Sequence, residues 1–130
     1  MYTIEKKNFG FKLTFGEFIR KAEMEKWLKD SEQALQGVKS PFGVFVDMRT
    51  LQPLPQESQE TMVRGQQFYK QSGMARSVVI LNDPITTLQF KRIAKESSIY
   101  NWERYIDASN TPDWEQKGLK WVVDNVDPDL

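Results

Sequence analysis

Three aspartates each follow a segment that the sequence predicts to be a strand: Asp47 after the apolar run Phe42–Val46, Asp83 soon after Leu81, and Asp107 at the end of the shorter segment 103–107. The carboxyl ends of parallel strands meet at one edge of a sheet, where α/β proteins bind ligands. Carboxylate oxygens gathered there would coordinate a hard cation such as Mg²⁺. Asp83, however, precedes a proline and suits a helix cap, and Asp47 suits hydrogen bonding within a loop. We therefore predict no metal site and no cofactor.

The stretch after Phe42–Val46 is predicted to be a loop from Asp47 to Pro55, stiffened by two prolines and followed by a helix that begins at Gln56. Loops outside the carboxyl ends of strands commonly carry function. The residues that we expect to contact a partner here are Arg49, Thr50, Gln52, Gln56, Ser58 and Gln59.

Arg49 and Ser58 each have a functional and an ordinary interpretation. The planar guanidinium of Arg49 can hold a carboxylate or phosphate of a partner, although an ion pair with Asp47 or Glu57 is its simpler role. At Ser58, the helix N-terminus would stabilise a phosphate, but the neighbouring carboxylate of Glu57 would oppose it. An ordinary residue of the first helical turn is the commoner role for such a serine.

Aromatic residues crowd the last third of the chain: Phe90, Tyr100, Trp102, Tyr105, Trp114 and Trp121. Most of them are expected in the core, because large aromatic side chains bury the most area. Tyr100 and Trp102 are different, since they lie in a connection without hydrophobic periodicity. We expect this pair to be partly exposed and to contact a protein, a lipid or a hydrophobic ligand, with simple packing as the alternative.

Composition excludes several classes of chemistry. The chain has no cysteine and no histidine, which removes disulfides, thiolate zinc sites, a cysteine nucleophile and the usual general base. Its 18 basic and 18 acidic side chains cancel, so we predict no nucleic-acid partner. The N-terminal residues lack an apolar signal core, and no segment approaches the roughly 20 apolar residues of a membrane span. We expect a cytoplasmic protein that is not an enzyme.

The elements that must position these residues follow from hydrophobic periodicity and turn signals. The runs Phe42–Val46 and Ser77–Leu81 lack polar alternation, which is typical of strands buried on both faces. The other predicted strands are 2–7, 11–15 and the edge strand 103–107, and the predicted helices are 20–36, 56–72, 84–97 and a last one from Pro112 to about Asn125. In the third helix, Ile85, Leu88, Ile93 and Ala94 are expected to face inward. This order predicts a single α/β domain over residues 1–130, with a mostly parallel sheet, an initial strand pair, helices covering the sheet and a frayed tail at 126–130.

The order of elements resembles the STAS fold of SpoIIAA-like proteins, the anti-sigma-factor antagonists and their relatives. The segments that carry the resemblance are Leu13–Glu17, Val44–Arg49, Ser77–Leu81 and Tyr105–Asp107. Antagonists of that family present a phosphorylatable serine in an Asp-Ser-Ser-Gly turn after the central strand. The matching stretch here, Pro53–Ser58, lacks that turn. The resemblance therefore implies a SpoIIAA-like module that binds a protein partner without the phosphorylation switch.

Two other functions remain open at this point. The first is a carrier or sensor of a small apolar ligand or lipid, held in a pocket beneath the last two helices and lined by Met62, Phe90 and Trp121. The second is an enzyme of unknown type. Exposed Gln52, Gln56 and Gln59 without a deep cavity would favour the partner, whereas such a pocket would favour the ligand.

Overall fold

The computed structural model describes residues 1–130 and contains a sheet of five strands, four α-helices and one short 3-10 helix. In chain order the elements are β1 (Tyr2–Lys7), β2 (Gly10–Glu17), α1 (Lys21–Ala34), β3 (Phe42–Leu51), α2 (Gln56–Gln71), β4 (Met74–Leu81), α3 (Pro84–Ser97), η1 (Tyr100–Trp102), β5 (Glu103–Asp107) and α4 (Trp114–Asp124).

The strands lie side by side in the order of the chain, from β1 to β5. β1 and β2 form an antiparallel hairpin in which Tyr2 pairs with Phe15, and the other neighbouring strands are parallel. The turn of the hairpin ends at Gly10, whose φ of 147° suits glycine. The prediction of a mostly parallel sheet with an initial strand pair is therefore confirmed.

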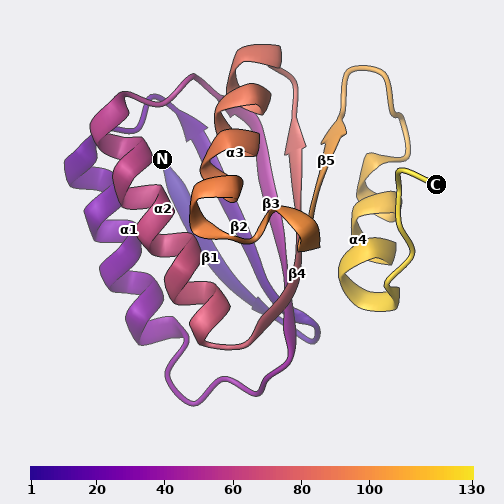
Figure 1. Ribbon diagram of the computed structural model, residues 1–130, viewed down its shortest axis with the longest axis horizontal. Coiled ribbons are helices and arrows are strands. Elements are labelled where there is room, and N and C mark those ends of the chain that lie inside the picture. Colours follow the sequence, from indigo (N-terminus) through magenta and orange to yellow (C-terminus); the bar gives the residue numbers. More distant parts are fainter.

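The helices cover the two faces of the sheet unequally (Figure 1). Parallel strands are joined by right-handed crossovers, and here each new strand is added on the same side of the one before it. The crossover helices α1, α2 and α3 consequently lie together on one face. α4 follows the last strand and folds back onto the other face, against β3, β4 and β5.

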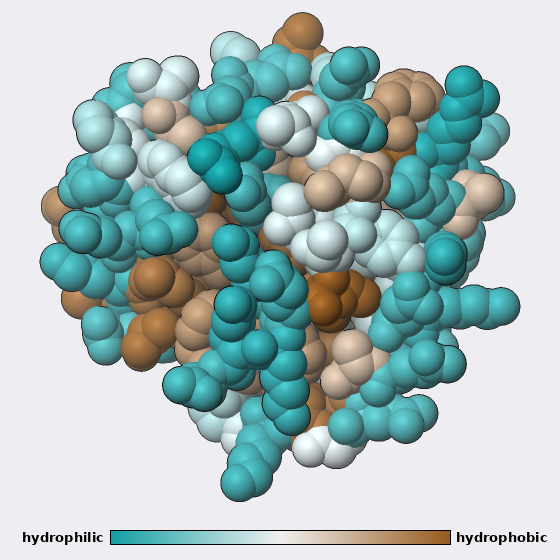
Figure 2. Space-filling view, turned by 180° about the vertical axis from the view of Figure 1, so that it is seen from behind, coloured by the Kyte–Doolittle hydropathy of each residue, from teal (hydrophilic) through white to brown (hydrophobic).

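Two hydrophobic cores result, one on each face. The larger contains 20 buried residues between the sheet and α1 to α3, including Trp27, Val46, Val79 and Phe90. The smaller contains six buried residues under α4: Phe45, Val78, Ile80, Ile106, Trp121 and Val122. The neighbouring residues Val78 and Val79 of β4 belong to different cores. β4 is therefore buried on both faces, which explains its continuously apolar sequence. Seen from behind, brown apolar atoms gather mainly on the half that α4 occupies, and the half over β1 and β2 is mostly polar (Figure 2).

The inward face of α3 differs from the predicted one. Thr86, Phe90, Ile93, Ala94 and Ser97 are buried, whereas Ile85 and Leu88 are 61% and 69% exposed. Residues 86, 90, 93, 94 and 97 form a single stripe at 3.6 residues per turn, and positions 85 and 88 fall on the opposite side of the helix. The prediction that Ile85 and Leu88 face inward was therefore wrong.

The two ends of the last helix show how α4 is held. It begins at Trp114, two residues later than the predicted start at Pro112, with Asp113 in the capping position. Beyond it, Asp127 accepts hydrogen bonds of 2.9 Å from both Nε and Nη2 of Arg104. This pair connects the predicted frayed tail to β5.

None of the helices combines the length and apolar character that a membrane-crossing helix needs.

Candidate functional site

The predicted partner-binding stretch is only partly a loop. β3 continues through Leu51, so Arg49 and Thr50 belong to the strand, and the connection to α2 spans residues 52–55 alone. The strand continues because β2 does: Thr50 pairs with Gly16, and Leu51 pairs with Glu17, after a register shift in the ladder. The predicted start of the loop at Asp47 was wrong. The prediction was made from the β3 segment alone, and the pairing with β2 extends this strand.

Arg49 is engaged by residues of its own chain. Its Nε and Nη2 donate hydrogen bonds of 3.0 and 2.9 Å to the two carboxylate oxygens of Asp47, which lies on the same face of the strand. Its guanidinium also lies 4.2 Å from the ring centroid of Trp114 on α4. Burial raises the pKa of the Asp47 carboxyl, but the hydrogen bonds from Arg49 outweigh burial and hold that pKa below its usual value. The ion pair with Asp47, the simpler of the two predicted roles, is the one that the geometry supports.

Ser58 is fully buried in the first turn of α2. Its hydroxyl donates a hydrogen bond of 2.9 Å to the backbone carbonyl of Ile19, which precedes α1. Neither a partner nor a modifying enzyme can reach this hydroxyl in the folded chain. Ser58 is therefore not available as a contact residue. Its role is that of an ordinary serine in the first turn of a helix.

The connection between β3 and α2 is held in place by two glutamines. Gln89 of α3 accepts a hydrogen bond of 2.8 Å from the backbone N–H of Leu54 and donates one of 3.3 Å to its carbonyl. Gln59 of α2 donates a third, of 2.8 Å, to the same carbonyl. The Leu54 side chain is buried, and prolines flank it on both sides. The loop is therefore preorganised, which lowers the entropy cost of binding a partner.

The exposed and partly exposed residues at this edge of the sheet, where the loop ends and α2 and α3 begin, form what we call the helix-start surface: Gln52, Gln56, Gln59, Ile85 and Leu88. α2 and α3 both begin at the carboxyl edge of the sheet and pack against each other. Gln59 is only partly exposed, because it bonds to Leu54 and contacts Arg92 of α3. Arg49 is not part of this surface, since its side chain packs against α4 on the opposite face of the sheet.

The three aspartates do not come together at the edge of the sheet, and no group of three or more acidic side chains lies close enough to hold a metal ion. Asp83 caps α3 by accepting a hydrogen bond of 2.9 Å from the N–H of Ile85, as predicted. Asp107 accepts hydrogen bonds from the backbone and hydroxyl of Ser109. Each carboxylate is thus used locally, Asp47 by Arg49 and the others within their own turns.

A buried carboxyl that sequence reasoning missed lies at the amino end of β5. Glu103 accepts hydrogen bonds of 2.6 Å from Ser77 and 2.7 Å from Tyr105, and its side chain is buried. Burial raises its pKa to about 7, although the two hydrogen bonds act in the opposite direction. No local pattern marks Glu103 in the sequence, because its burial follows from pairing in register with Ser77, which stands directly before four buried apolar residues of β4.

Glu103 and Ser77 also line a cavity of about 30 Å³ between the sheet and the helical layer. Its other lining residues include Trp27, Met62, Gln66 and Phe90. This volume accommodates about one water molecule. Trp121, which was predicted to line a pocket together with Met62 and Phe90, lies in the other core. α3 and α4 cover opposite faces of the sheet, so the predicted pocket beneath both helices cannot form.

Tyr100 and Trp102 are 37% and 49% exposed in η1. They lie at the C-terminal end of α3, far along that helix from Ile85. The ammonium of Lys95 is 4.8 Å from the Tyr100 ring centroid, and that of Lys70 is 5.2 Å from the Trp102 ring centroid. The structure therefore separates the predicted contact residues into three places: the helix-start surface, the Arg49 ion pair and η1.

No match was found when the chain was compared with protein-family models, with curated proteins or with solved structures.

Proposed function

We propose that this chain is a non-catalytic, cytoplasmic protein-interaction module of the SpoIIAA-like STAS type, which binds a partner protein through its helix-start surface. The family part of the proposal is supported by the order of elements and by a parallel sheet with an antiparallel first strand. The missing Asp-Ser-Ser-Gly turn and the burial of Ser58 support a module without a phosphorylation switch at that position.

The observation that carries the proposal is the pair of exposed apolar side chains on α3. Ile85 and Leu88 are the most exposed large hydrophobic residues apart from the C-terminal Leu130. They lie three residues apart, which places them side by side on the helix surface. Next to them, the Leu54 loop is fixed by Gln59 and Gln89. An apolar centre beside exposed amide side chains, on a preorganised backbone, is the composition of a protein interface with a polar rim.

The competing function, an apolar ligand or lipid held beneath the last two helices, receives less support from the geometry of that region. Pockets for small molecules commonly measure about 300 to 1,000 Å³. The cavity lined by Met62 and Phe90 measures about 30 Å³, so a lipid would have to separate the helices from the sheet. The exposure of Gln52 and Gln56, together with this small cavity, favours the protein partner.

The test is a double substitution, Ile85→Gln with Leu88→Gln. A partner recovered with the wild-type protein from a lysate of the source cells would be purified and its affinity measured by calorimetry. We expect the double variant to weaken binding at least tenfold, because hot-spot residues each contribute more than about 1 kcal/mol. Thermal stability should change little, since both side chains are exposed.

A matched control is Val123→Gln with Val126→Gln. Both valines are about half exposed: Val123 lies in the last turn of α4 and Val126 lies two residues beyond its end, on the other side of the molecule from α3. Their substitution should leave the affinity unchanged. If both double variants weaken binding equally, or if only the control does, the helix-start surface is not the interface.

A further inference from the structure

A hollow of about 430 Å³ lies beside η1, at the amino end of β4 and on the opposite end of α3 from the helix-start surface. We call it the Trp102 hollow. Trp102 and Ile99 form one wall, Met74 and Ala75 of β4 add apolar surface, and Lys70 and Arg76 bring positive charge. Its volume falls within the range of small-molecule pockets, about 300 to 1,000 Å³.

The two cations of the Trp102 hollow have no carboxylate partner. Lys70 donates a hydrogen bond of 3.1 Å to the backbone carbonyl of Ser98. Arg76 uses Nε and Nη2 to bond the carbonyls of Trp121 and Val122 at the end of α4, at 2.8 and 3.2 Å. Neither residue takes part in any of the ion pairs of the chain. The carbonyls at the ends of α3 and α4 offset part of these two charges, and no carboxylate neutralises the rest. The hollow therefore keeps a positive charge that is complementary to an anion.

Both side chains have hydrogen-bond donors that no atom of the chain accepts. Arg76 keeps Nη1 without a hydrogen-bond partner, and the Lys70 ammonium has donors beyond the one given to Ser98. Arg76 alternates with Val78 and bonds α4, whereas Lys70 belongs to α2, so the two side chains approach the hollow from opposite faces of the sheet. Each has a donor left for an anion bound in the hollow. Charge-assisted hydrogen bonds of this kind are roughly twice as strong as neutral ones.

The indole of Trp102 supplies the second part of the site. Trp27 and Trp121 are almost fully buried, whereas Trp102 is 49% exposed at the edge of the hollow. An exposed indole face attracts cations and stacks on other aromatic rings. Lys70 is exposed, and its long side chain can place the ammonium either over the ring or towards an anion in the hollow.

We propose that the Trp102 hollow binds a small aromatic carboxylate, whose ring stacks on Trp102 and whose carboxylate is held between Lys70 and Arg76. This site is independent of the helix-start surface, since it lies at the other end of α3 and shares no residue with that surface. Because of this separation, ligand binding can be tested without the protein partner.

The test is a titration of the ¹⁵N-labelled protein with indole-3-acetate, followed by NMR. The four tryptophans give separate side-chain indole signals. We expect a saturable shift of the Trp102 indole signal and of the backbone amides of Ala75 and Ile99. Indole alone and acetate alone, each at the same concentration, should give smaller shifts, because each provides only one of the two interactions.

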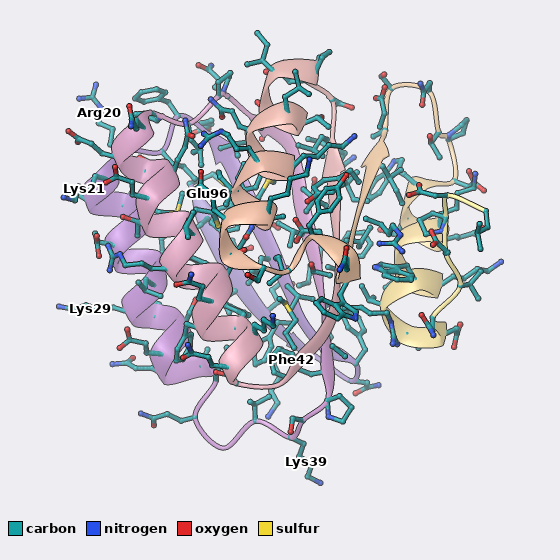
Figure 3. The ribbon with its side chains drawn as sticks, in the orientation of Figure 1. Arg20, Lys21, Lys29, Lys39, Phe42 and Glu96 are labelled. Atoms are coloured by element: carbon teal, nitrogen blue, oxygen red, sulfur yellow. The ribbon has the colours of Figure 1, made fainter.

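Three variants assign the effect to the site. Trp102→Leu should abolish the saturable shift of the Ala75 and Ile99 amides; the residue is half exposed, so the fold is expected to be retained. Lys70→Gln should weaken binding about two- to fivefold, the range of an exposed charge pair. Lys29→Gln makes the same charge change on the outer side of α1, well away from η1, and should leave the affinity unchanged (Figure 3).

The proposal is overturned by any of three results. The first is a titration without saturation, and the second is a set of shifts located outside the Trp102 hollow. The third is an equal loss of affinity in Lys29→Gln and Lys70→Gln, which would indicate attraction to the overall charge of the surface instead of a defined site.

Discussion

Three helices cover one face of the sheet, whereas α4 alone covers part of the other. The two faces differ in the kind of polar side chains that they contain. Under the three helices, polar side chains are buried in neutral hydrogen-bonded pairs such as Ser31 with Tyr69, at 2.8 Å, and Ser97 with Gln66, at 2.6 Å. Beside α4, a charged pair is retained in which Arg49 is 41% exposed to water and Asp47 is 12% exposed. Complete coverage makes an isolated charge costly, and partial coverage allows an ion pair to stay solvated.

The largest effect is expected when a buried phenylalanine is truncated to alanine in each core and the losses in the free energy of unfolding are compared. Phe90→Ala should lower the free energy of unfolding by about 3 to 5 kcal/mol, because Phe90 is fully buried among three helices and the sheet. Phe45→Ala should cost less, since α4 is a single helix that can move towards the gap. Urea denaturation of the two variants measures both losses. An equal or larger loss for Phe45→Ala would contradict the view that the smaller core is the more adaptable one.

A loss of stability as the pH rises towards 7 is expected from the three-helix face, because that face holds Glu103. Burial raises the pKa of Glu103 from 4.5 in the unfolded chain to about 7 in the folded one. Below about pH 4.5 the carboxyl is protonated in both states; as the pH rises towards 7, the unfolded state releases a proton that the folded state retains. Stability should therefore decline by about 3 kcal/mol across this window and level off above it, at about 1.4 kcal/mol per pKa unit.

The comparison with Glu103→Gln isolates this contribution from that of the other carboxyls. The free energy of unfolding should depend less steeply on pH between 4.5 and 7 in this variant than in the wild type. Glu96→Gln, at an exposed position of α3, should keep the wild-type slope. An unchanged slope in Glu103→Gln would mean that the buried carboxyl does not retain its proton.

The smallest effect is expected at the ion pair beside α4. A double-mutant cycle of Asp47→Asn and Arg49→Gln should give a coupling energy of about 1 kcal/mol, since the pair is bidentate and Asp47 is largely shielded. The exposed pair of Arg92 and Glu96 provides the control, with about 0.3 to 0.5 kcal/mol. Thermal denaturation of each variant measures these couplings. A coupling at Asp47 no larger than the control value would remove the distinction between the two pairs.

The sequence predicted features that depend on neighbours along the chain. The apolar runs around Val46 and Val79 indicated buried central strands, and Asp83 before Pro84 indicated a helix start. Both signals are local, because burial on two faces removes polar alternation and a cap acts within one turn. The mostly parallel sheet followed from the alternation of these strands with helices. The order of the strands within the sheet was not predicted.

The features that were missed depend on contacts between distant segments. Ser58 is buried because its hydroxyl reaches Ile19, 39 residues earlier, and Glu103 is buried beside Ser77, 26 residues earlier. Residue type alone does not show that Ile85 and Leu88 point outward, since apolar residues occur on surfaces as well as in cores. Of the helix-start surface, the sequence therefore predicted the glutamines such as Gln52 and Gln56. It did not predict the apolar residues Ile85 and Leu88.

The order of the strands has a consequence for how the chain can fold during its synthesis. Each parallel strand pairs with the strand made just before it, so no later segment has to insert between two that are already paired. Domains fold from the N-terminus as the ribosome releases them, and contacts close in sequence form early. The sheet and its layer of α1 to α3 can thus assemble in order as β1 to β5 emerge. The apolar residues that α4 covers stay open to solvent until Asp124 has been synthesised, which makes this face the one that a nascent chain exposes longest.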